Sequence, residues 1–267
     1  MAVQGPLANK IAIITGSGKE NGIGAAIALT LARAGARVTI NYVSDSSAAR
    51  AVEVVSAIEA AAGKGSVISI QADVSTAEGT KKIVEGTLSG FKVDHIDIIG
   101  KNPSLNNAAI ATYSPTLQTP PEDIFRVFGV VVVGPVLLLQ AAYPHIPHGG
   151  RVINIGTVSS KMGFYQLPIY AAAKAAMDQL TWTLSREIGR DGKNITINTI
   201  APGPVDTDSV PAGDPGAQAL KKWLISLTRA EDRVGTVNDI ADAVLLLADE
   251  KSRWITGQYI SASGGIV

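Results

Sequence analysis

Cysteine is absent from the 267-residue sequence, which excludes disulfide bonds, thiolate metal ligands and a cysteine nucleophile. Net charge is also lacking, because 23 Lys and Arg residues balance 23 Asp and Glu residues. A chain without a basic excess offers no electrostatic attraction for nucleic acid, and no polybasic segment marks a membrane surface. We therefore expect neither a nucleic acid nor a membrane among its partners.

Long hydrophobic runs are scarce too. The longest apolar run, 127–139, is interrupted by Gly129, Gly134 and Pro135 and is shorter than a membrane span requires. The first ten residues lack the charged head and apolar middle of a signal peptide. The three histidines show no metal-ligand spacing. We expect a cytoplasmic protein that binds no metal ion.

Short apolar runs that alternate with segments of helical periodicity dominate the rest of the chain. Strands are expected at 10–15, 37–43, 66–71, 96–99, 151–155, 195–200 and 258–261, and helices at 23–33, 46–62, 76–89, 121–143, 168–189 and 238–248. Strands separated by helices require parallel pairing with crossovers. The pattern predicts an α/β fold with a doubly wound parallel sheet, in one domain over 1–267. The segment at about 204–234, rich in Pro, Gly and Asp, is expected to be a small helical lid over the substrate.

The first expected strand-to-helix turn, TGSGKENGIG at 15–24, is rich in glycine. Glycines let the chain turn sharply and let backbone N–H groups approach a pyrophosphate at the positive end of the helix. The position between a strand and a helix favours a dinucleotide site over a merely glycine-rich loop. The candidate contacts are Gly16, Ser17, Lys19, Asn21, Gly22, Ile23 and Gly24.

The end of the second strand bears on the choice of cofactor. An acidic side chain there would bind the adenosine ribose and repel a 2′-phosphate, but the sequence reads NYVS at 41–44. Lys19 and Ser44 are placed to receive a phosphate, so we favour NADP(H). In the alternative, NAD(H), Lys19 is solvated and Asp45 binds the ribose. Candidate contacts here are Asn41, Tyr42 and Ser44.

Tyr170 and Lys174 stand four residues apart in the alanine-rich run YAAAK. On an α-helix, residues i and i+4 share a face, so the phenol and the ammonium can point into one site. Bringing a tyrosine pKa from about 10 close to neutrality needs about 4 kcal/mol. A lysine charge about 4 Å away supplies on the order of 4 kcal/mol at an effective dielectric constant near 20. The pair can act as a general acid or base, although an ordinary surface helix gives the same spacing.

Taken together and in order, these motifs resemble those of the short-chain dehydrogenase/reductase family over essentially the whole chain. The matching stretches are the turn at 15–24, Asp73-Val74, NNAA at 106–109, Thr157, the Tyr170 and Lys174 pair, and PGPVDT at 202–207. Within the family, NYVSDSSAARAVEVVSAIEA and RVINIGT are similar to 3-oxoacyl reductases and fungal polyhydroxynaphthalene-type ketoreductases. The resemblance implies a Rossmann fold and a homo-oligomer, either a dimer or a tetramer.

The resemblance also implies roles for these residues. Tyr170 would exchange a proton with the substrate oxygen, Lys174 would hold the nicotinamide ribose, and Thr157 would bond the substrate carbonyl. The cofactor would further be contacted by Asp73 and Val74 at the adenine, by Asn107 and Ala108 near the adenosine or nicotinamide ribose, and by Val205 and Thr207 at the carboxamide. Pro202 and Gly203 of the same motif are further candidate cofactor contacts.

Several positions depart from the family pattern. The glycine-rich turn has two extra residues, GKNPS at 100–104 lengthens the approach to Asn106, Ala109 replaces a glycine, and Thr157 replaces a serine. Val131 stands where the family has an asparagine that supports a water chain from the active-site lysine. Either another group or water serves this relay, or proton exchange is slow, or the reaction does not need it.

The expected pocket is apolar, with Met162, Phe164, Tyr165, Leu167 and Trp223 as candidate lining residues, although such side chains also pack against one another or a neighbouring subunit. We expect an NADPH-dependent ketoreductase for an apolar carbonyl or alcohol substrate such as a polyketide. The alternatives are non-redox biosynthetic chemistry, such as cyclisation or isomerisation, and cofactor binding without turnover.

Overall fold

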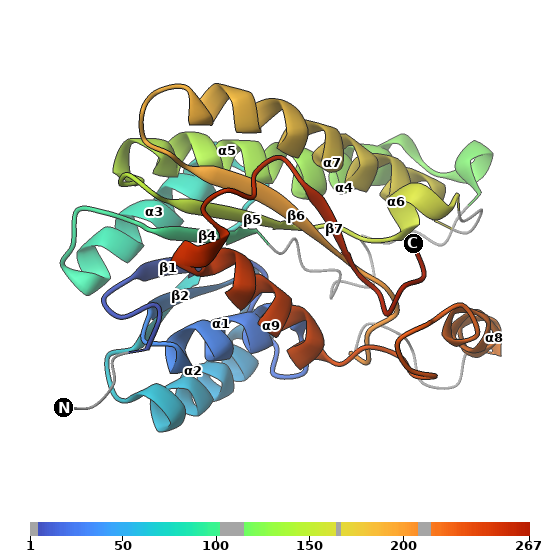
Figure 1. Ribbon diagram of the computed structural model, residues 1–267, viewed down its shortest axis with the longest axis horizontal. Helices are drawn as coiled ribbons and strands as arrows, with labels where there is room; N and C mark the ends of the chain where they lie inside the picture. The colour runs from blue at the N-terminus through green and yellow to red at the C-terminus, as the bar shows by residue number, and fades with distance from the viewer. Residues whose placement is uncertain (1–4, 102–114, 164–166, 208–214) are drawn as a thin grey trace.

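Seven parallel strands form one sheet (Figure 1), and the computed structural model describes residues 5–101, 115–163, 167–207 and 215–267. The strands are β1 (Ile11–Ile14), β2 (Arg37–Tyr42), β3 (Val67–Gln71), β4 (Ile98–Lys101), β5 (Arg151–Ile155), β6 (Thr196–Pro202) and β7 (Tyr259–Ala262). Their spatial order is β3-β2-β1-β4-β5-β6-β7. This confirms the predicted doubly wound sheet. The order reverses between β1 and β4, which is where such sheets bind ligands, at the carboxyl ends of the strands.

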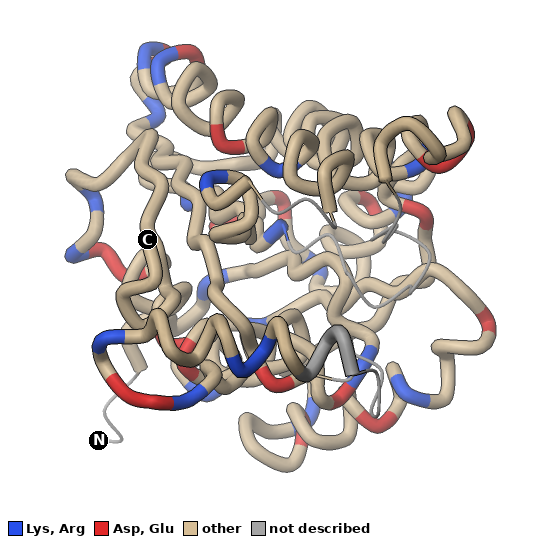
Figure 2. Tube along the Cα trace, turned by 90° about the vertical axis from the view of Figure 1, so that its right-hand side faces the viewer, with Lys and Arg blue, Asp and Glu red and all other residues tan. Residues whose placement is uncertain are grey.

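The helices cover both faces of the sheet. They are α1 (Ile23–Arg33), α2 (Ala48–Ala62), α3 (Ala77–Phe91), α4 (Pro121–Phe128), α5 (Gly134–Ala142), α6 (Ser159–Met162), α7 (Pro168–Gly189), α8 (Pro215–Ile225) and α9 (Val237–Ala248). Figure 1 shows α1, α2 and α9 on one face and α3, α4, α5 and α7 on the other. In Figure 2, lysines and arginines alternate with aspartates and glutamates around the molecule.

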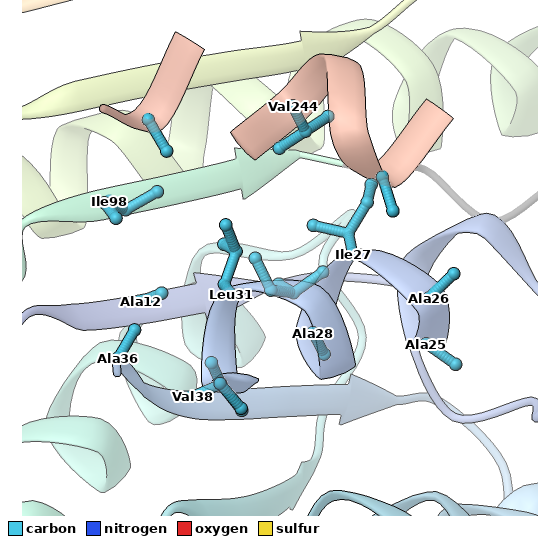
Figure 3. Close-up of a cluster of buried hydrophobic side chains, with 14 of the residues drawn as sticks. Ala12, Ala25, Ala26, Ile27, Ala28, Leu31, Ala36, Val38, Ile98 and Val244 are labelled. Atoms are coloured by element: carbon cyan, nitrogen blue, oxygen red, sulfur yellow. The ribbon is translucent and has the colours of Figure 1, made fainter. Parts of the chain in front are cut away.

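Small side chains bring α1 close to the sheet and to α9. In the close-up, Ile27 and Leu31 of α1 lie between β1 and Val244 of α9, with Ala28 beside them (Figure 3). Ile27 and Leu31 are fully buried, which stabilises the fold by about 1.5–3 kcal/mol for each side chain. This packing fixes the first turn of α1 above the end of β1, where the dinucleotide site is expected.

The helix expected at 121–143 changes its hydrogen-bonding pattern midway. Between α4 and α5 lies a π-helical turn, η3 (Gly129–Val133), and such turns often occur at functional sites. By the length of 121–145 and by the mean hydropathy of 2.1 in its most apolar 18-residue window, this helix could cross a membrane. However, Leu138 and Leu139 pack into the core between α3 and the sheet, so this part of the chain is a core helix.

Candidate functional site

The glycine-rich turn is held at the switch point by hydrogen bonds to both neighbouring strands. The Thr15 N–H donates to the Gly100 carbonyl of β4 over 3.1 Å, and the Ser17 N–H donates to the Asn41 carbonyl of β2 over 3.0 Å. Gly16 has a φ of 59°, a left-handed conformation that glycine adopts without strain. At Gly18, a Cβ atom would lie 2.6 Å from the Cβ of Tyr42, so a glycine is required there.

The first turn of α1 follows directly. Its N-cap, Gly22, makes no side-chain capping bond, and the first N–H groups of a helix carry a positive partial charge. This arrangement at the carboxyl edge of the sheet fits the pyrophosphate of a dinucleotide. Lys19, Asn21, Ile23 and Gly24 lie in the turn and the first turn of the helix.

Two of the expected contacts, Ser17 and Asn41, hold the turn in place through their side chains. The Ser17 hydroxyl donates to the Ile14 carbonyl over 2.6 Å and accepts from the Asn41 N–H over 3.0 Å. The Asn41 amide nitrogen donates to the carbonyls of Ile70 and Ala72 at 3.2 and 3.0 Å. Both side chains are buried and are oriented into the protein by these bonds.

At the end of β2, the candidates for the adenosine ribose are arranged differently. The Ser44 hydroxyl lies 2.8 and 2.9 Å from the hydroxyls of Ser46 and Ser47. The Asp45 carboxylate accepts a 2.8 Å bond from the Gln71 amide. Asp45 is therefore already engaged by β3, whereas the Tyr42 side chain is half-buried against the glycine-rich turn.

Tyr170 and Lys174 lie in the first turns of α7, which begins with Pro168 at a position that suits proline. Both side chains are buried. The Lys174 Nζ donates to the Ile155 carbonyl at the end of β5 over 2.6 Å and lies 5.6 Å from the centre of the Tyr170 ring. Burial lowers the pKa of Lys174 to about 7, against the opposing charge of Asp178. At neutral pH, Lys174 is therefore charged in only a fraction of the protein molecules.

Thr157 follows β5 by two residues, at the same carboxyl edge of the sheet as the Ile155 carbonyl that bonds Lys174. Its hydroxyl accepts a 3.2 Å bond from the Ser159 N–H, and its carbonyl accepts bonds from the Ser160 and Tyr259 hydroxyls at 2.9 and 3.2 Å. The backbone position of Thr157 is thus fixed from α6 and from β7. The short helix α6 is an element that the sequence analysis missed.

The remaining candidates lie along the same edge. Asp73 accepts two bonds from Ser75 at 2.8 and 2.7 Å and so closes the turn after β3. Val74 passes close to α5, because a Cβ at Gly134 would lie 2.6 Å from its carbonyl. Pro202 ends β6, Gly203 packs on Ser263, Val205 pairs with Gly235, and Thr207 is half-buried. Asn107 and Ala108 lie outside the described residues, as do Phe164 and Tyr165.

Of the expected pocket residues, Met162 and Leu167 are half-buried and Trp223 is half-exposed. Leu167 packs against the cluster that contains Val131 and Tyr170. Within the segment predicted as a lid, α8 forms a helix, and residues 208–214 lie outside the described part of the chain. Its role as a lid stays a prediction.

Lys101 is a buried charge that the sequence analysis did not single out. It ends β4 and is 1% exposed, and burial lowers its pKa to about 7. No hydrogen bond or ion pair joins it to another described residue. Beside it lies a cavity of about 10 Å³, lined also by Thr15, Val74, Val130, Gly134, Pro135 and Leu138, which is room for one water molecule. A lysine in an otherwise apolar strand was the signal available in the sequence.

Comparisons with known proteins agree with this geometry. A family model described as Enoyl-(Acyl carrier protein) reductase matches residues 16–267. The chain is 36% identical over 264 residues to the short-chain dehydrogenase/reductase FrzI of a Cladobotryum species, covering 98% of this chain and 97% of that protein. It is 34% identical over 272 residues to the hydroxynaphthalene reductase-like protein Arp2 of Metarhizium acridum, covering 98% and 96%. The solved structure of the angucycline C-6 ketoreductase LanV with bound NADP matches with a TM-score of 0.84 at 30% identity, covering 98% and 97%.

Proposed function

Because the chain belongs to the short-chain dehydrogenase/reductase family of NAD(P)-dependent enzymes, we propose that it is an NADPH-dependent ketoreductase for an apolar carbonyl compound of the polyketide type. The family assignment confirms the resemblance expected from the sequence. The observation that carries the proposal is the buried Tyr170 and Lys174 pair, which α7 holds against the end of β5 at the carboxyl edge of the sheet.

In this reaction, the bound NADPH supplies a hydride to the carbonyl carbon. Tyr170 donates its phenolic proton to the carbonyl oxygen, which yields the alcohol. Thr157 donates a hydrogen bond to the same oxygen and orients it. Lys174 stabilises the phenolate that Tyr170 becomes, and its 2.6 Å bond to the Ile155 carbonyl holds the ammonium 5.6 Å from the centre of the Tyr170 ring.

Two features support NADPH over NADH. Lys19 in the glycine-rich turn is the basic residue for the 2′-phosphate, with Ser44 at the end of β2 as a hydroxyl donor. Asp45, the acidic residue that would bind the ribose of NADH, is engaged by the Gln71 amide over 2.8 Å. The solved structure of LanV, to which the chain is similar, contains NADP.

The substrate class rests on the pocket and on the relatives. Met162, Leu167 and Trp223 offer apolar surface around the site, which suits an aromatic or otherwise apolar ketone. Two similar proteins are described as a hydroxynaphthalene reductase-like protein and an angucycline ketoreductase. From the naphthalene and angucycline skeletons that these descriptions name, we infer a fused-ring ketone as the substrate of this chain.

An oligomer is part of the proposal. The helix at 121–145 contains a long apolar window, yet only 33% of that window is buried within the chain. Phe125 and Val133 are 76% and 46% exposed on it. A second copy of the chain would cover this surface, as a dimer or tetramer, and light scattering of the purified protein tests it.

Reduction of an aromatic ketone tests the function directly. Purified protein should oxidise NADPH in the presence of a hydroxynaphthalene-type ketone and release the alcohol. Tyr170→Phe should lower turnover by about 10²–10⁴-fold and leave NADPH affinity within about twofold. Tyr143→Phe, which alters a surface tyrosine bonded to Asp191, is the matched control. Retained turnover in Tyr170→Phe would remove this phenol from the mechanism.

A non-redox reaction is the second candidate, and Val131 favours it. This side chain is 1% exposed and packs against Tyr170 in an apolar cluster, so the proton relay of the family lacks its asparagine. If the protein is instead a cyclase or isomerase, a product of unchanged oxidation state should form with no net consumption of NADPH. Product analysis with and without reduced cofactor separates the two candidates.

A further inference from the structure

Lys174 has to regain a proton after each reduction, and Val131 leaves that step without its expected route. Val131 packs with Tyr170, Ala173 and Met177 and has no atom that forms a strong hydrogen bond. The inference below concerns how this proton returns, and it rests on the ketoreductase function proposed above. Another polar group, the Asp178 carboxyl, lies on α7, the helix that carries Lys174.

Asp178 lies one turn beyond Lys174 on α7, so Tyr170, Lys174 and Asp178 follow one another along one helix face. Its Oδ1 atom is buried and has no hydrogen-bond partner among the described residues. This oxygen lies 3.3 Å from the position that a Cβ atom would take at Gly156. The carbonyl of the preceding residue, Ile155, accepts the 2.6 Å bond from Lys174. The carboxyl and the amine therefore approach the same stretch of backbone at the end of β5.

The other carboxyl oxygen of Asp178 lies 2.7 Å from the Ser160 hydroxyl, which also lies 2.9 Å from the Thr157 carbonyl. Serine has one hydroxyl hydrogen. The Thr157 carbonyl also accepts a 3.2 Å bond from the Tyr259 hydroxyl, so it keeps a donor when Ser160 gives its hydrogen to the Asp178 Oδ2 atom. If Asp178 is protonated, its hydrogen then lies on Oδ1, the buried oxygen without a partner among the described residues, on the side of the backbone that Lys174 approaches. Burial raises the pKa of Asp178, which agrees with this arrangement.

Charged and titratable groups face Asp178 from three elements. Lys174 lies on its own helix and Lys161 on α6, and both charges act against the effect of burial and favour the carboxylate. Tyr259 of β7 donates to the Thr157 carbonyl over 3.2 Å, and its ring lies 4.4 Å from the Lys161 Nζ. Burial raises the pKa of Tyr259, so this phenol stays protonated. Burial therefore favours the protonated form of Asp178, whereas the two lysine charges favour the carboxylate. This balance suits a group that takes up and releases a proton in each cycle.

We propose that Asp178, together with Ser160, returns a proton to Lys174 after each reduction, by a route that does not use the helix position of Val131. Tyr170 gives its proton to the substrate oxygen and recovers one from the Lys174 ammonium. The neutral amine then takes the proton of the Asp178 carboxyl. Because no ion pair joins these two described side chains directly, one bridging water completes this transfer. Solvent protonates the Ser160 oxygen as Ser160 passes its own hydrogen to Asp178. One proton moves from water to the product in each turnover, and no electrons move along this path.

The test separates the first turnover from later ones. With the protein preloaded with NADPH, Asp178→Asn should reduce the first equivalent of ketone at a rate within about twofold of wild type, because Tyr170 is still protonated. Steady-state turnover should fall by about tenfold or more, since proton transfer groups contribute at least this much. Small buffer acids should restore turnover in proportion to their concentration. The double variant Asp178→Asn with Val131→Asn should also regain turnover. Ser160→Ala should show the same pattern more weakly, which covers the case in which Asp178→Asn folds poorly.

Two controls accompany this experiment. Glu187→Gln changes an exposed acid at the far end of α7 and should alter neither rate. Infrared difference spectra of the cofactor-free protein should show a protonated carboxyl band that Asp178→Asn removes, which is a readout independent of activity. Equal losses in the first and later turnovers, or none, would overturn the relay. A wild-type protein that reduces no ketone would overturn the proposed function and the relay with it, whereas an active wild type without the buffer effect overturns the relay alone.

Discussion

Replacing the buried Lys101 by methionine should make the cofactor-free protein more stable. Methionine has a similar length and volume and carries no charge. Burial lowers the pKa of Lys101 from 10.5 to about 7, which at about 1.36 kcal/mol per pH unit corresponds to about 5 kcal/mol of destabilisation at neutral pH. The adjacent cavity of about 10 Å³ has room for one water molecule, which would solvate the amine in part and reduce this cost. We therefore expect Lys101→Met to gain about 2–5 kcal/mol in free energy of unfolding.

The sign of the pH dependence follows from which state takes up the proton. Above pH 10.5 the amine is neutral in both states, and Lys101 carries no electrostatic cost. As the pH falls from 10.5 to about 7, the unfolded chain binds a proton that the folded chain does not, so stability declines over this window. Below about 7 both states are protonated and the cost stays constant. Lys174 has a similarly lowered pKa but is present in both proteins, so their difference isolates Lys101.

Urea unfolding followed by circular dichroism at pH 7 and pH 9 measures this effect. A gain of 2 kcal/mol shifts the midpoint by about 1 M or more for a slope of about 1–2 kcal/mol per M. The advantage of Lys101→Met should be smaller at pH 9 than at pH 7. Lys82→Met, on the exposed side of α3, is the matched control and should leave the midpoint within about 0.5 kcal/mol. An unchanged or lower midpoint for Lys101→Met would refute the assignment of Lys101 as a buried charge without a partner in the described part of the chain.

Two further changes test the cofactor site and the start of α9. Lys19→Glu should weaken NADPH binding by at least about tenfold, or about 1.4 kcal/mol, and change NADH binding much less. Calorimetric titration with both cofactors measures this effect. An unaltered preference for NADPH over NADH would remove Lys19 from the phosphate site. Asp239→Asn should cost about 1 kcal/mol at pH 7, because Asp239 completes a capping box with Thr236 and binds Arg233 at 2.7 Å. The hydrogen bond from Arg233 holds the pKa of Asp239 well below its usual range, so this contribution is present above the unfolded pKa near 4 and is lost as the pH falls through the folded value. Its side chain is 41% exposed, which keeps the expected loss small, and a variant as stable as wild type in urea at pH 7 would contradict the capping role.

The sequence predicted the order of elements because each buried strand and each amphipathic helix has its own hydrophobic period. The helix at 168–189 was placed at its observed ends, since Pro168 and Gly189 mark them in the sequence. The π-helical turn at Gly129–Val133 was not predicted, because its valines suit any helix and only tertiary packing selects the wider turn. β4 runs two residues beyond the expected end, to Lys101, since a lysine ordinarily argues against a buried strand.

In the candidate site too, some residues could be predicted from their spacing in the sequence, whereas others depend on contacts between distant elements. Tyr170 and Lys174 share a helix face by spacing alone, and that part needed no structure. Asp178 has the same four-residue spacing from Lys174, but its importance depends on Ser160, which reaches it from α6 over 2.7 Å, and on Gly156, whose Cβ position would lie 3.3 Å from the Asp178 Oδ1 atom. Neither contact has a sequence period. The orientation of Ser17 and Asn41 into the protein is likewise a tertiary result, because their bonds run to β1, β2 and β3 at once. A motif therefore predicts which residue types gather at the carboxyl edge, whereas the hydrogen-bond partners decide which of them remain available to a ligand.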